Sequence, residues 1–207
     1  MKVRPLLLSL LAGLAACVDG SGRGIATVDA CPIAPELHYF PAGRFGESDQ
    51  FVRRWYSRHL AVMREPSLYC GTPRADELYR FVWLRTFDNP IAVRVSRIGD
   101  SYTLNAVSLS GAGGYDPGAV SRQIERPLSR SEWHAVLAQL DRAQFWTMDT
   151  SLNDAGNDGS EWIVEARQAG RYHIVSRWSP TPEDVGVRPV GMLMLELAGL
   201  EEVGRVY

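Results

Sequence analysis

The sequence predicts an α+β domain: a mainly antiparallel sheet with about three helices packed against one of its faces. Three stretches have the apolar spacing of amphipathic helices, and several strand-like runs follow one another with short glycine-containing turns between them. Strands joined by short turns pair antiparallel, because a parallel pair needs a long crossover. Residues 31–207 suffice for one such domain, and a composition of 45% hydrophobic and 22% charged residues is ordinary for a globular protein.

The first helix is expected over residues 49–64. Ser48 can cap its start, apolar side chains recur at spacings of one, three and four residues, and Pro66 ends it. His59 lies on the apolar face of this helix, where a packing role fits better than ligand binding.

Three strands are expected next. The run 79–87 is aromatic and nearly continuous in apolar residues, as in a central strand, whereas residues 91–96 alternate as in a half-exposed one. Gly99-Asp100 separates them from a third run, 102–109, and suits a type II′ turn because glycine accepts its positive φ. The glycine-rich stretch 111–118 is expected to be a long turn or mobile flap, with a backbone site for a small anion as the alternative.

Two more helices complete the prediction. Ser129 and Glu132 have the spacing of a capping box at the start of a helix over residues 130–143. An apolar stripe predicts the last helix over residues 188–200.

The polar loop Asp149–Gly159 carries several carboxylates, but it does not match a calcium-binding loop. If Asp149 is position one of such a loop, position six is Asp154, where glycine is needed, and position twelve is Ser160 rather than glutamate. We therefore predict no metal site and no cofactor.

The hairpin Glu161–Trp178 can adopt two registers. A two-residue loop at 169–170 mixes apolar and charged side chains on both faces. A three-residue loop at 168–170 places the tryptophans on one face and the charged side chains on the other, so we expect this register.

The three-residue loop would bring charged side chains together across the hairpin. Glu165 would face His173, and Glu161 would face Arg177. A carboxylate beside His173 would raise its pKa. Glu165, His173 and Arg177 are the catalytic candidates, an acid–base pair with an anion-binding arginine. Surface charge matching explains the same pattern without catalysis.

The N-terminus has the form of a secretory signal. Residues 1–4 are basic, and the apolar residues 6–14 are too few to span a bilayer. Leu14-Ala15-Ala16-Cys17 resembles the lipobox of bacterial lipoproteins, in which the cysteine is lipidated and becomes the first residue of the mature chain. Because Val18 rather than aspartate follows, the resemblance implies the outer membrane, facing the periplasm.

This resemblance divides the chain into a signal peptide (1–16), a lipidated Cys17 with a flexible tether (17–30) and the single domain. The only lysine is Lys2, so a mature chain would lack a Schiff-base or P-loop lysine. A net charge of -2 predicts no nucleic-acid surface. Cys31 and Cys70 are candidates for a disulfide, which an export compartment permits.

We therefore expect a non-enzymatic, envelope-anchored lipoprotein that binds or helps assemble a periplasmic protein or glycan, and that contacts the membrane through its anchor. The alternative is a cell-envelope hydrolase that uses Glu165 and His173. The body of the chain is also similar to uncharacterised exported bacterial proteins, a resemblance that brings no activity with it. The residues that carry it are Asp158-Gly159, Trp162, Glu165, Tyr172-His173 and Arg177-Trp178-Ser179-Pro180.

Overall fold

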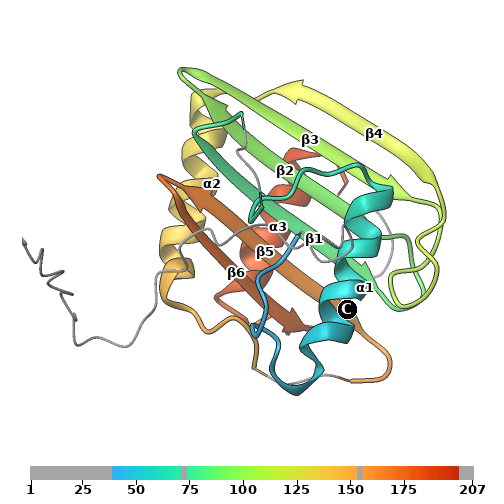
Figure 1. Ribbon diagram of the computed structural model, residues 1–207. Coiled ribbons are helices and arrows are strands. Elements are labelled where there is room, and N and C mark those ends of the chain that lie inside the picture. The colour runs from blue at the N-terminus through green and yellow to red at the C-terminus, as the bar shows by residue number, and fades with distance from the viewer. Residues whose placement is uncertain (1–38, 71–73, 153–155, 201–207) are drawn as a thin grey trace, which may run out of the picture.

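The structure is a computed structural model and describes residues 39–70, 74–152 and 156–200. Within this part a six-stranded antiparallel sheet packs against three helices, which confirms the predicted α+β class (Figure 1). The strands are β1 (Glu77–Arg85), β2 (Ile91–Ile98), β3 (Ser101–Leu109), β4 (Val120–Pro127), β5 (Ser160–Gln168) and β6 (Arg171–Trp178). The helices are α1 (Asp49–Val62), α2 (Arg130–Arg142) and α3 (Val187–Leu197), with 3-10 turns at Gly46–Ser48 and Phe145–Thr147.

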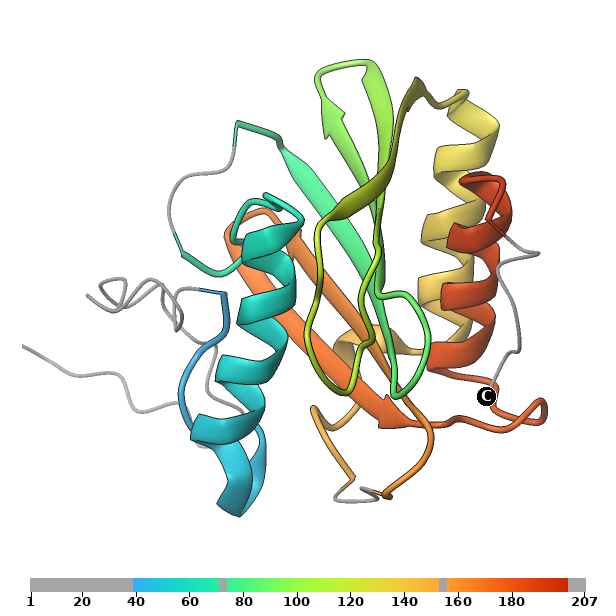
Figure 2. The same cartoon turned by 90° about the vertical axis from the view of Figure 1, so that its right-hand side faces the viewer.

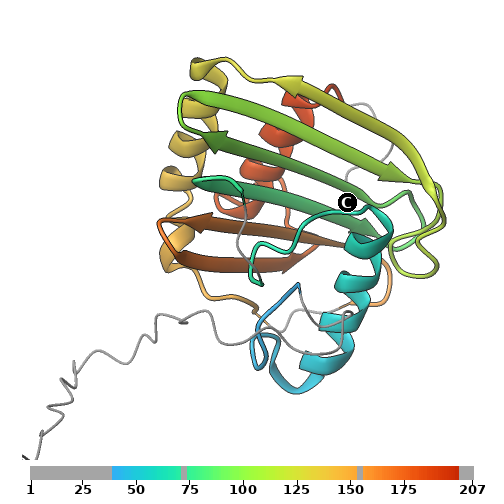
Figure 3. The same ribbon diagram turned by 45° about the horizontal axis from the view of Figure 1, so that its top comes forward.

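The strand order is β4-β3-β2-β1-β5-β6, which Figure 3 shows from top to bottom. The first four strands form a meander, and after α2 the chain returns to the free side of β1. This places β1 and β5 inside the sheet, where each has a neighbour on both sides.

The helices cover both faces of the sheet rather than one, which corrects the prediction. Figure 2 shows α1 on one side and α2 with α3 on the other. Alternate residues of β1 enter the two layers: Phe81 and Trp83 face α2 and α3, while Val82 and Leu84 face α1. Because both faces of β1 are covered by helices, the strand needs no polar side, and this explains its nearly continuous apolar run.

Of the two predicted N-terminal caps, the one at α2 forms and the one at α1 does not. Ser129 and Glu132 form the predicted capping box at α2, with backbone-to-side-chain bonds in both directions. Ser48 makes no side-chain capping bond at α1. There the carboxylate of Asp49 accepts bonds from the backbone N–H groups of Arg44 and Phe45.

The turn between β2 and β3 has the predicted form. Ile98 pairs with Ser101, so the loop consists of Gly99 and Asp100, and Gly99 has a φ of 55°. Asp100 is not among the residues with positive φ, which agrees with a type II′ turn.

Strand β4 was not predicted. It is an edge strand whose polar residues Ser121–Gln123 are exposed, and only Ile124 among its residues packs against the core as a partly buried hydrophobic residue. An edge strand with so little buried surface carries only a weak alternation of apolar and polar residues.

Candidate functional site

The β5–β6 hairpin turns through two residues, so the predicted three-residue loop is wrong. Gln168 pairs with Arg171, and both loop residues have positive φ, 48° at Ala169 and 77° at Gly170. Two positive φ values define a type I′ turn, whose twist matches that of the flanking strands.

This register separates the candidate catalytic residues. Glu165 lies opposite Ile174 instead of His173, and Glu161 lies opposite Trp178 instead of Arg177. Cross-strand partners share a face and neighbours along a strand alternate, so the two glutamates point toward α1 while His173 and Arg177 point toward the other layer. The predicted acid–base pair therefore does not form.

The predicted register was wrong because it assumed that one face of the hairpin would be exposed to solvent. Both faces are covered, and on the α1 side the acids are buried together with polar partners. Glu165 pairs across the sheet with Arg80 of β1, its direct neighbour in the β1–β5 ladder. The signal was present in the sequence as an arginine inside the otherwise apolar strand.

Glu165 and Arg80 form a fully buried ion pair. Arg80 donates from Nε (2.9 Å) and Nη2 (2.5 Å) to Oε2 of Glu165, and the hydroxyl of Tyr172 donates to Oε1 at 2.8 Å. Both side chains of the ion pair have no exposed surface. Burial lowers the pKa of Arg80, but the carboxylates of Glu165 and Glu65 outweigh it, so the pKa is raised.

A second acid and a second arginine extend this network to four charges. Glu65, which follows α1, accepts from Arg80 at 3.4 Å and from Nε of Arg94 at 2.9 Å. Arg80 also donates to the carbonyl of Pro66 at 2.7 Å. With two positive and two negative side chains the network is neutral, which is the condition under which buried charges are tolerated.

Glu161 belongs to a separate buried cluster on the same face. The hydroxyl of Ser176 donates to its carboxylate at 2.5 Å and lies 3.1 Å from the hydroxyl of Tyr56 on α1. Burial raises the pKa of Glu161, more than the bonds from these hydroxyls and the charge of Arg177 lower it. A carboxyl of this kind resembles that of a general acid, but all three side chains of the cluster are buried.

His173 lies in the opposite layer and packs against aromatic rings. Its ring centroid is 4.9 Å from that of Phe145 and 6.2 Å from that of Trp146, and its Nε2 lies 3.1 Å from the carbonyl of Met148. Burial lowers the pKa of His173, opposite to the prediction, because the carboxylate expected beside it is on the other face.

Arg177 binds the segment 145–150, which precedes β5, to the edge of the sheet. Its guanidinium donates to the carbonyl of Asp149 at 3.0 Å, and the backbone N–H of Ser176 donates to the carbonyl of Thr150 at 2.7 Å. Residues 145–150 thus cover the edge of β6. Arg177 has a structural role here, and it lies on the opposite face of the hairpin from Glu165, so the two do not share a site.

The glycine-rich loop is packed rather than open. Its N–H groups donate to backbone carbonyls: Gly111 to Pro117, Ala112 to Asp116, Gly113 to Asp88 and Gly114 to Thr86. A nest for an anion needs free N–H groups, so this part of the loop does not offer one.

Two further predictions depend partly on residues outside the described part. Cys17 and Cys31 lie there, so lipidation stays a prediction, and so does the Cys31–Cys70 pairing, although Cys70 is in a disulfide bond.

Among residues 39–70, 74–152 and 156–200, no three His, Cys, Asp or Glu side chains gather as a metal site. In the same ranges no helix combines the length and the apolar character needed to cross a bilayer.

No protein-family model matches the sequence, and no curated protein is detectably similar to it.

Proposed function

We propose that the protein is a non-enzymatic lipoprotein of the bacterial envelope, a binding or assembly module tethered through Cys17 at the periplasmic side of the outer membrane. Its partner is a periplasmic protein or a glycan. The observation that carries this proposal is the separation of Glu165 from His173 onto opposite faces of the sheet. Each is committed to partners inside the fold, Glu165 to Arg80 and His173 to the segment before β5.

The hydrolase alternative loses its support from this geometry. An acid–base pair must reach one substrate together, from a surface that the substrate can enter. Glu165 is fully buried beneath α1 and the chain that follows it, and His173 lies in the other layer. Glu161, whose pKa is also raised, is buried as well, so we propose binding alone.

Genetic complementation separates binding from catalysis. His173→Phe keeps the aromatic packing and removes the imidazole, and it should restore any envelope phenotype of the deletion strain as fully as the wild type does. Crosslinking of the lipidated protein in intact cells should recover one periplasmic partner. Loss of complementation by a stably folded His173→Phe protein, or absence of both a partner and a deletion phenotype, would overturn the proposal.

A further inference from the structure

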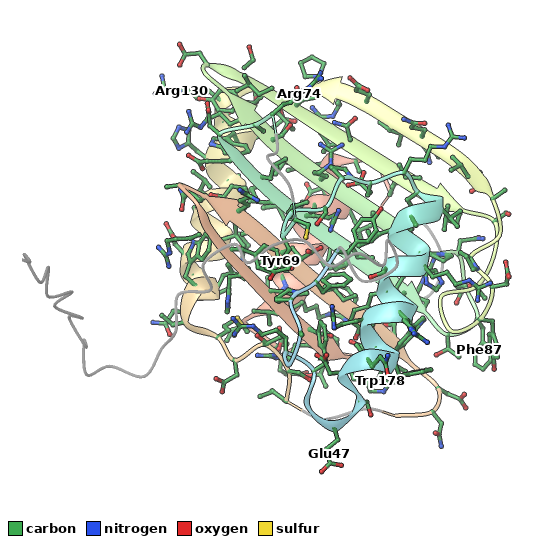
Figure 4. All side chains as sticks on the ribbon, viewed as in Figure 1. Glu47, Tyr69, Arg74, Phe87, Arg130 and Trp178 are labelled. Carbon is green, nitrogen blue, oxygen red and sulfur yellow. The ribbon has the colours of Figure 1, made fainter. Side chains whose placement is uncertain are left out.

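Three exposed aromatic side chains and one partly buried one lie at one end of the sheet, and we call this group the aromatic rim: Phe51, Phe87 and Tyr115 with Trp55. Phe51 is 70% exposed, Tyr115 62% and Phe87 61%. The ring centroids of Phe51 and Trp55 are 6.2 Å apart, and those of Phe87 and Tyr115 are 6.1 Å apart. Figure 4 shows Phe87 pointing outward beyond the ends of the strands, beside α1.

The two aromatic pairs are joined through the glycine-rich loop. The indole N–H of Trp55 donates to the carbonyl of Gly113 at 2.6 Å, and Tyr115 follows two residues later. A Cβ at Gly113 would lie 2.5 Å from the backbone nitrogen of Arg85, so the loop sits directly on the end of β1. The loop that carries Tyr115 is therefore fixed on the end of the sheet and next to Trp55.

Basic side chains lie beside the rim on α1. Arg54 and Arg58 are exposed, and Arg58 pairs with Asp116 of the loop at 2.6 Å. Aromatic rings suit the boundary of a bilayer, where they sit among the headgroups, and the guanidinium of Arg54 can meet phosphate there, while that of Arg58 is paired with Asp116.

The chain joins the folded body on the same face as α1. The hydroxyl of Tyr39, the first described residue, donates to the carbonyl of Glu65, and Arg53 of α1 donates to the carbonyl of Phe40. The predicted tether, residues 17–30, would connect the domain to the membrane, and a flexible chain of that length spans roughly 20 Å. Such a short tether keeps the domain at an effective concentration on the order of millimolar near its membrane, so weak contacts suffice to orient it.

We propose that the aromatic rim rests on the membrane that holds Cys17 and fixes the orientation of the domain on it. This inference depends on the proposed lipid anchor. It adds a second, non-covalent membrane contact and leaves the remaining surface facing the periplasm for the partner.

Hydroxyl-radical footprinting of the full chain tests this contact. The lipidated protein is placed on nanodiscs of phosphatidylethanolamine and phosphatidylglycerol after mass spectrometry has verified acylation of Cys17, and the unlipidated Cys17→Ser chain is measured free in buffer. Oxidation of Phe51, Phe87 and Tyr115 should fall several-fold on the nanodisc. Ile98 at the opposite end of the sheet is 57% exposed and serves as the matched control, whose oxidation should not change.

A variant series gives a second measurement. In the Cys17→Ser chain, Phe51→Ser, Phe87→Ser and Tyr115→Ser together should lower the fraction that sediments with vesicles of the same lipids several-fold, and Ile98→Ser should leave it unchanged. These side chains are exposed, so the variants should fold.

Each other outcome overturns the inference in a recognisable way. Equal oxidation of the rim on and off the nanodisc, with Cys17 acylated, would refute membrane contact and leave the proposed function intact. Protection that appears only after addition of a soluble envelope extract would assign the rim to a protein partner. Protection in buffer that grows with protein concentration would assign it to a second copy of the chain. An unmodified Cys17 would overturn the proposed function together with this inference.

Discussion

Removal of the Glu165 carboxylate should strongly destabilise the fold. Glu165→Ala would leave Arg80 buried without the acceptor of two of its bonds, and the hydroxyl of Tyr172 without its acceptor. Arg80 would retain the longer contact to Glu65, the bond to Pro66 and its position over the ring of Tyr39. Breaking a buried pair by removing one partner typically costs about 3–5 kcal/mol, and we expect a loss of unfolding free energy in this range.

Urea unfolding followed by tryptophan fluorescence, with disulfides kept oxidised, measures this loss, since Trp83, Trp133 and Trp162 are deeply buried. The control is Glu125→Ala on the exposed edge strand, which should change stability by less than about 0.5 kcal/mol.

A double variant separates the charge pair from simple packing. Replacing both partners, Arg80→Met with Glu165→Leu, should recover most of the loss, because no unpaired charge remains buried. A loss below about 1 kcal/mol for Glu165→Ala, or a double variant less stable than that single one, would refute the assignment of Glu165 as a structural carboxylate.

Three other predictions test the remaining buried groups. Because burial raises the pKa of Glu161, the folded state holds this proton more tightly than the unfolded state, so the group's contribution to stability should fall as pH rises from about 4.5 through the folded pKa. Urea midpoints of Glu161→Gln should lack this fall, and a wild type that gains stability relative to the variant over that range would contradict the reasoning. The imidazole of His173 should titrate below 6.5 by NMR, because burial lowers its pKa, and its contribution to stability should be lost as pH falls below 6.5; a value above 6.5 would indicate a neighbouring carboxylate after all. Gly113→Ala places a Cβ against the backbone of Arg85 and should cost about 1–3 kcal/mol in urea unfolding, whereas wild-type stability would show that the loop is free to move.

Two local signals in the sequence predicted local structure correctly, whereas the expected cap at Ser48 does not form. The capping box of Ser129 and Glu132 and the turn at Gly99-Asp100 each depend on a few adjacent residues and on backbone geometry alone, and both are present. These features need no knowledge of what packs above them.

The wrong hairpin register and the helices expected on one face share one cause, which is that the sequence does not state which faces of a sheet are covered. The hairpin register was chosen to keep Glu165 in water, and that choice was wrong because α1 covers this face and Arg80 supplies the counter-charge. The position of α1 follows from tertiary packing, so the helical periodicity of residues 49–62 could not indicate it. The exposed strand β4 has too little apolar surface to be found from its pattern.

Intact-mass and peptide mass spectrometry of the protein purified from bacterial membranes tests the central claim most directly. The proposed lipoprotein predicts a mature chain that begins at Cys17, lacks residues 1–16 and carries acyl chains on that cysteine. A chain that retains Met1, or that begins elsewhere and carries an unmodified Cys17, would contradict it.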